Sequence, residues 1–121
     1  MIHGVFVQNT PWLKIIVGWK QSIQEPFVIL DTGFTGDLQV TPKIAKELNL
    51  EVTGVTKMQI ANGKVVNTPV ALALASMEGE KNYVQVLISG GAPLLGISFL
   101  SRFSYKAVVN CKNKTIILRK V

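Results

Sequence analysis

Short apolar segments, separated by Gly, Asn or Pro, run through the whole of this 121-residue sequence. Segments of this length, rich in Val, Ile, Leu and Phe and bounded by turn residues, are typical of β-strands. None approaches the ~20 apolar residues that a membrane-spanning helix needs. A closed or folded-over sheet is therefore expected, built from strands at Val5–Val7, Leu13–Trp19, Phe27–Leu30, Lys57–Ala61, Lys64–Val66, Val70–Ser76, Tyr83–Ile88, Ala107–Asn110 and Thr115–Leu118.

Turn residues predict three hairpins. Asn62-Gly63 predicts a type I′ turn, because both residues readily adopt positive φ angles. Weaker signals of the same kind occur at Glu78-Gly79 and at Asn113.

Two short helices are expected among the strands. In Thr41–Leu48, Thr41 can cap the first free amides and Pro42 suits the first helical position, and Ile44 and Leu48 would share the buried face. A second helix is expected to begin at Gly96 and to place the apolar residues Phe99, Leu100 and Phe103 in the core.

Composition indicates one globular domain over residues 1–121, because 48% of the residues are hydrophobic and 17% are charged. The N-terminus lacks the features of a secretory signal, and the single cysteine, Cys111, fits a reducing compartment, so a cytoplasmic location is expected. The net charge of +6 would favour nucleic acid, but apart from Arg119-Lys120 the basic residues are scattered. We expect no nucleic-acid or membrane partner.

The scarce reactive side chains exclude most catalytic mechanisms. A Ser-His-Asp or Cys-His site would depend on His3, close to the chain end, and Cys111 lies in no recognisable nucleophile turn. One His and one Cys do not make a zinc site. Gly90-Gly91 lacks the helix and Lys of a phosphate-binding loop, so no metal or cofactor is expected. Carboxylate chemistry remains, with Asp31 and Asp37 as the candidates.

Asp31 ends the apolar run Phe27–Leu30 and is followed at once by Thr32-Gly33. Removing a carboxylate from water costs several kcal/mol unless hydrogen bonds or a functional arrangement compensate. Asp ahead of Gly also caps turns by accepting backbone amides, so the local pattern is compatible with a catalytic or a turn role. The same two kinds of role, contact with a substrate main chain or a turn, are open for Asp37.

Three segments resemble parts of the retropepsin-like (clan AA) aspartic proteases, and their order and spacing along the chain agree with that family. Ile29-Leu30-Asp31-Thr32-Gly33-Phe34-Thr35-Gly36 resembles their active-site loop. Pro93-Leu94-Leu95-Gly96-Ile97-Ser98-Phe99-Leu100 is similar to their second signature, and Met58-Gln59-Ile60-Ala61-Asn62-Gly63-Lys64-Val65 to their flap hairpin. The resemblance covers roughly residues 25 to 118, and the residue Phe34 is similar to that of a bacterial and archaeal branch.

The resemblance implies a mainly β, single-lobe acid-protease barrel with one or two short helices. It also implies a homodimer, because two carboxylates must share a proton and one chain has a single such Asp31. The expected activity is aspartic endopeptidase, with a peptide or protein substrate and no cofactor. The terminal segments Met1–Val7 and Thr115–Val121 would form the subunit contact.

The resemblance also assigns roles to residues around Asp31. Thr32 would bond the partner's loop, and Gly33 would let backbone and substrate approach closely. Leu95 and Gly96 would support the loop, while a flap made of Ile60, Ala61, Asn62 and Gly63 would close over the substrate.

Phe34 departs from the small Ser or Ala that most relatives have after Asp-Thr-Gly. Its bulk would fill or reshape the first substrate pocket. The alternative function is therefore a catalytically inactive dimeric domain that binds peptides or proteins in the same groove.

Overall fold

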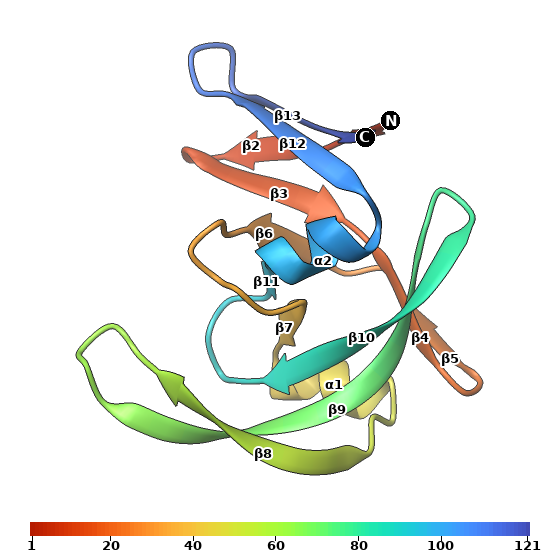
Figure 1. The fold of residues 1–121 in the computed structure, drawn as a ribbon, viewed down its shortest axis with the longest axis vertical. Coiled ribbons are helices and arrows are strands. Elements are labelled where there is room, and N and C mark those ends of the chain that lie inside the picture. The colour runs from red at the N-terminus through yellow and green to blue at the C-terminus, as the bar shows by residue number, and fades with distance from the viewer.

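The computed structural model describes residues Met1–Val121 and is mainly β, with two short helices, as predicted (Figure 1). Neither helix is long and apolar enough to span a membrane. The elements are β1 (Ile2–His3), β2 (Val5–Val7), β3 (Thr10–Lys14), β4 (Ile16–Trp19), β5 (Ser22–Gln24), β6 (Phe27–Leu30), β7 (Leu38–Val40), α1 (Pro42–Glu47), β8 (Val52–Gln59), β9 (Val65–Met77), β10 (Glu80–Ile88), β11 (Leu94–Leu95), α2 (Ile97–Arg102), β12 (Tyr105–Asn110) and β13 (Thr115–Lys120).

A curled ten-stranded sheet forms most of the molecule, with neighbours in the order β2-β3-β6-β11-β7-β10-β9-β4-β5 and β8 paired to β9 alone. A smaller sheet has the order β1-β13-β12 and brings the two chain ends together (Figure 1). In the middle of the large sheet, β11 pairs in parallel with β6 and antiparallel with β7. This pairing aligns Leu94 with Ile29 and Leu95 with Leu30, so two of the segments singled out in the sequence lie side by side.

The core lies inside the curled sheet and holds 21 buried residues in one cluster. Along β9 the small residues Ala71, Ala73 and Ala75 are buried at every second position, as the period of a strand requires. Phe99 and Phe103 from α2 and the residue after it pack with ring centroids 4.8 Å apart and are fully buried. Each such ring stabilises the fold by about 1.5–3 kcal/mol through burial.

The predicted helices are confirmed with small shifts at their ends. The hydroxyl of Thr41 accepts a hydrogen bond from the Ile44 amide at 3.2 Å, and Pro42 begins α1. Leu48 is fully buried and Ile44 partly so. Gly96 is the residue before α2, and Phe99, Leu100 and Phe103 lie in the core as expected.

Several strand predictions were wrong in their bounds. Leu13–Trp19 is two strands, because the chain leaves β6 at Lys14 and joins β9 from Ile16, while Ile15 stays buried between them. Asn67–Pro69 was predicted to interrupt a strand, but these weak strand formers pair with β8 and continue β9. The very short strands β1, β5, β7 and β11 were not predicted.

The turn at Asn62-Gly63 is not type I′. Only Gly63 has a positive φ, of 83°, and its amide donates to the Ile60 carbonyl oxygen at 2.9 Å. The Ile60 amide donates to the Lys64 carbonyl oxygen, so the hairpin loop has three residues, with Gly63 in the left-handed position. Three-residue loops of this kind are a common alternative to the two-residue type I′ turn. Ala61 is thus a loop residue, and the type I′ turn is at Glu78-Gly79, where both φ angles are positive.

Candidate active site

Asp31 lies just beyond the end of β6, in a turn that its own side chain helps to form. Its Oδ1 accepts a hydrogen bond from the Gly33 amide at 2.9 Å, and its carbonyl oxygen accepts from the Phe34 amide at 3.1 Å. Its amide donates to the carbonyl oxygen of Leu95 at 3.0 Å. Asp31 is partly buried as a residue and lines a cleft, so it has a turn role and also contacts the space of the cleft.

The loop that follows Asp31 is held from behind by the start of α2. The Gly96 amide donates to the backbone carbonyl oxygen of Asp37 at 3.0 Å, and the Ile97 amide donates to the carbonyl oxygen of Phe34 at 2.9 Å. A Cβ atom on Gly96 would lie 2.1 Å from the Gly36 carbonyl oxygen, a distance that no side chain tolerates. Position 96 therefore requires glycine for space, since its φ of −105° is open to any residue.

Asp37 is a structural residue of this loop. It is 3% exposed, and both of its carboxylate oxygens accept from Arg102 Nε, at 2.8 and 2.9 Å. Its Oδ2 also accepts from the Gln85 amide at 2.8 Å. The carboxylate thus ties the loop to α2 and β10, which is neither the substrate contact nor the simple turn role considered from sequence.

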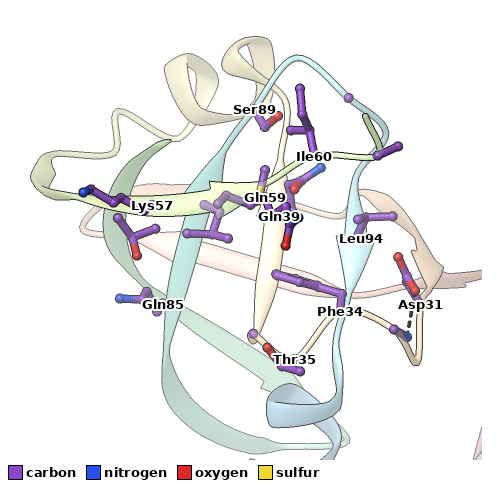
Figure 2. Close-up of a pocket in the computed structure, with 17 residues that line it drawn as sticks. Asp31, Phe34, Thr35, Gln39, Lys57, Gln59, Ile60, Gln85, Ser89 and Leu94 are labelled. Carbon is purple, nitrogen blue, oxygen red and sulfur yellow. Dashed lines mark hydrogen bonds between the residues drawn. The ribbon is translucent and has the colours of Figure 1, made fainter. Parts of the chain in front are cut away.

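The ring of Phe34 packs against the loop and lines the cleft that Asp31 also lines. Atoms of its ring would be 2.7 Å from a Cβ on Gly36 and 2.8 Å from one on Gly96. The ring therefore rests directly on the backbone of two glycines, and its other side faces the cleft (Figure 2). Phe34 therefore forms part of the cleft lining, together with Asp31.

The cleft has a volume of about 880 Å³ and separates the Asp31 loop from the β8–β9 hairpin. Ile60 and Ala61 of that hairpin line it, whereas Asn62 and Gly63 lie at the tip and do not. Figure 2 shows Ile60 on the far side of the cleft from Phe34. The full set of lining residues is Asp31, Gly33, Phe34, Thr35, Gly36, Gln39, Thr56, Lys57, Met58, Gln59, Ile60, Ala61, Gln85, Leu87, Ser89, Gly91 and Leu94.

The predicted site residues therefore fall into three groups. Asp31, Gly33, Phe34, Ile60 and Ala61 line the cleft, Leu95 and Gly96 support it from behind, and Thr32, Asn62 and Gly63 are exposed outside it. Sequence reasoning did not select the polar residues of the wall, such as Gln39, Gln59 and Gln85. The alternation of side chains along a strand indicates which residues share a face. It does not indicate which face lines the cleft unless the order of the strands is known.

The charges on the cleft are few. Asp31 is the only acidic lining residue and Lys57 the only basic one. Any carboxylate chemistry in this cleft would therefore depend on Asp31.

No family model matches the sequence, and no curated protein matches it. Among solved structures, the protease of EIAV in complex with the inhibitor HBY-793 superposes with a TM-score of 0.70 and 18% identity, over 85% of this chain and 96% of that one. A retropepsin-like aspartic protease from Rickettsia conorii gives 0.64 and 18% identity, over 98% of this chain and 89% of that one.

These similarities cover 85% and 98% of this chain, and they show which fold it has. The protein has the single-lobe retropepsin-like fold, mainly β and with two short helices, that the sequence predicted.

Proposed function

We propose that this chain is one subunit of a homodimeric aspartic endopeptidase, with Asp31 as its catalytic carboxylate. One observation carries the proposal, namely that Asp31 is the only carboxylate lining a cleft in a lobe of retropepsin-like fold. The domain of residues 1–121 would thus supply half of an active site.

The need for a second subunit comes from the chemistry. Hydrolysis of an amide without a metal or covalent intermediate requires one carboxylate to accept a proton from water and another to donate one. Two carboxyl groups that share a proton satisfy both needs. Twofold symmetry would bring the Asp31 side chains of two copies together, because an isologous contact places identical residues at its axis.

In the proposed mechanism, a water molecule held between the two Asp31 carboxyl groups loses a proton to the ionised one and attacks the peptide carbonyl carbon. The protonated carboxyl donates its proton to the carbonyl oxygen, which gives a gem-diol. As the C–N bond breaks, the proton taken from water passes to the leaving nitrogen, and a diol hydroxyl returns a proton to the second carboxyl. The substrate would lie extended against the β8–β9 hairpin, since strand addition supplies main-chain hydrogen bonds. Closure of this hairpin, with its tip at Asn62 and Gly63, would exclude bulk water.

Thr32 and the chain ends are assigned to the contact between subunits. Thr32 is exposed next to Asp31, and its hydroxyl makes no hydrogen bond within the chain, so it is free to bond the partner's loop. β1 pairs with β13, which places Met1–Val7 and Thr115–Val121 at one surface with the sheet edges of β1 and β12 unpaired. Unpaired edges favour pairing with a second chain.

The proposal is tested by incubating the purified protein with an unbiased peptide library, beside the substitution Asp31→Asn. We expect cleavage that is strongest at mildly acidic pH, where a shared proton is present, and a loss of at least about a hundredfold in rate for Asp31→Asn. Sedimentation should find the same dimer for both proteins. A rate that still rises at pH 9 contradicts the shared-proton mechanism.

The rival function is a catalytically inactive dimeric domain that binds peptides or proteins. The ring of Phe34 beside Asp31 favours it, because the ring occupies space that a substrate residue would use. Equal peptide binding by the native protein and Asp31→Asn, with hydrolysis by neither, would establish the rival.

A further inference from the structure

Gln39 is a polar side chain with apolar neighbours at the floor of the cleft. It lies on β7, in the middle of the large sheet, directly opposite Leu94 of β11 on one side and Leu87 of β10 on the other. Residues paired in this way point to the same face of a sheet, and all three line the cleft. Figure 2 shows Gln39 between Ile60 of the hairpin and Phe34 of the loop.

The side chain of Gln39 is fixed and cannot turn into bulk solvent. The residue is only 5% exposed, and its amide nitrogen donates to the Ala92 carbonyl oxygen at 3.0 Å. The segment after β10 lies against this amide, because a Cβ on Gly91 would be 3.5 Å from its nitrogen. Gln85 differs, since it lines the same cleft but is exposed, so its side chain stays in water.

The hydrogen bond to Ala92 uses only part of what the Gln39 amide offers. An amide group has two N–H donors and an oxygen that accepts two hydrogen bonds. No group of the chain donates to the Gln39 oxygen, and one N–H is unused. Solvent reaches these positions while the cleft is open, but a ligand on the floor displaces it. A ligand without matching groups then leaves a buried donor and acceptor unpaired, which lowers its affinity.

We propose that Gln39 selects a Gln or Asn side chain of an extended peptide. A primary amide offers a donor and an acceptor side by side, so each of two amides can donate to the oxygen of the other. An aliphatic side chain lacks both groups, and an ionised one would lose its hydration between two leucines without an opposite charge. The inference rests on the proposed function, because it takes the ligand to be a peptide with its scissile bond at Asp31.

The strand order relates this position to the scissile bond. Leu94 is also opposite Ile29, which precedes Asp31 by two residues, so β6 and β7 are two strand spacings apart. Adjacent strands lie about 4.8 Å apart, and an extended peptide advances about 3.3 Å per residue. The selected side chain would therefore lie within about four residues of the scissile bond.

Peptide binding to the inactive Asp31→Asn variant tests the inference separately from catalysis. The probes are matched pairs of fluorescein-labelled decapeptide pools, in which one fixed position within about four residues of the centre carries either Gln or the similarly sized Met. Anisotropy titrations give the affinity ratio for each position. The substitutions added to this variant are Gln39→Met and, as the matched control at an exposed residue of the same cleft, Gln85→Met.

We expect the Gln pool to bind about tenfold more tightly than the Met pool when the fixed position is the one that reaches Gln39. The substitution Gln39→Met should reverse this preference and raise the affinity for the Met pool, a gain that a misfolded protein cannot give. Gln85→Met should leave the preference unchanged.

Equal affinities at every position, no binding of any pool, absence of the gain in Gln39→Met, or loss of the preference in Gln85→Met would overturn the inference. If the preference behaves as expected but the native protein cleaves no peptide, the proposed catalysis fails while this inference stands. If the native protein cleaves peptides but shows no preference, only this inference fails.

Discussion

The loop after Asp31 and the β8–β9 hairpin face each other across one cleft, but they are held in place differently. The loop is bonded to β11, α2 and β10 through Leu95, Gly96, Arg102 and Gln85. The outer part of the hairpin is exposed from Gln59 to Asn67, and β8 pairs with no strand other than β9.

The contrast is also visible in the glycines of the two regions. A Cβ on Gly96 would meet the Gly36 carbonyl oxygen at 2.1 Å, whereas a Cβ on Gly63 would meet nothing within 4 Å. A firmly bonded loop after Asp31 and a hairpin with few contacts suit a site in which the reacting groups stay fixed while a substrate enters and leaves.

The substitution Gly96→Ala should reduce the free energy of unfolding by more than about 3 kcal/mol, because the new methyl group would force two backbone segments apart. Urea unfolding measures the loss. Gly90→Ala is the matched control, since a Cβ there meets nothing within 4 Å, and it should change stability by less than about 0.5 kcal/mol. Similar values for the two variants would show that the loop is not tightly held.

The substitution Asp37→Ala should cost about 2 kcal/mol, because it leaves the Gln85 amide without its buried acceptor and removes the partner of the half-exposed Arg102 guanidinium. Its control is Glu25→Ala, which removes the exposed pair of Lys14 and Glu25 at 3.3 Å. That pair should contribute less than about 1 kcal/mol. Equal losses in thermal unfolding would place Asp37 outside the framework of the loop.

The substitution Gly63→Ala should cost about 1 kcal/mol, since alanine is strained at a φ of 83° although space is free. Hydrogen exchange should accelerate at hairpin amides such as Val65 and stay unchanged at Asp31. Faster exchange in both regions would mean that hairpin and loop open as one unit.

The other end of β9 is followed by Glu78, whose carboxylate accepts a hydrogen bond from the Tyr105 hydroxyl at 2.7 Å. This hydrogen bond fixes the turn after β9 to β12. Burial, then the hydrogen bond to Glu78, raises the pKa of Tyr105 well above its usual value. A raised pKa in the folded state gives stability that is complete below pH 10 and is lost as pH rises above it.

Between pH 9 and pH 11 the free energy of unfolding should therefore fall by no more than about 1.4 kcal/mol in all, because the tyrosine of the unfolded chain begins to ionise only near pH 10. Unfolding series at pH 9 and 11 measure the decline. Tyr105→Phe should be less stable at pH 9 and show a smaller decline, and an unchanged decline would point to other groups.

The features of the fold and of the candidate site that depend on residues adjacent in the sequence, or on a motif of the resembled family, were predicted from the sequence. Asp31 at the end of an apolar strand, the cap at Thr41 and the glycine ahead of α2 are of this kind. The pairing of Asp37 with Arg102 joins residues 65 positions apart, and no local pattern indicates it.

The polar side of the cleft escaped prediction for a similar reason. Thr56 and Gln85 line the same cleft only because β8 and β10 both pair with β9. In the Asn62-Gly63 loop, the choice between two and three residues depends on the strand register, which the dipeptide alone does not fix.

Mixing native and Asp31→Asn subunits is the most direct test of an acid pair assembled from two identical chains. After exchange of subunits at a fixed total concentration, peptide cleavage should follow the square of the native fraction, so an equal mixture should retain about a quarter of the native rate. A rate proportional to the native fraction, about half in that mixture, would mean that each Asp31 works alone and would contradict the account.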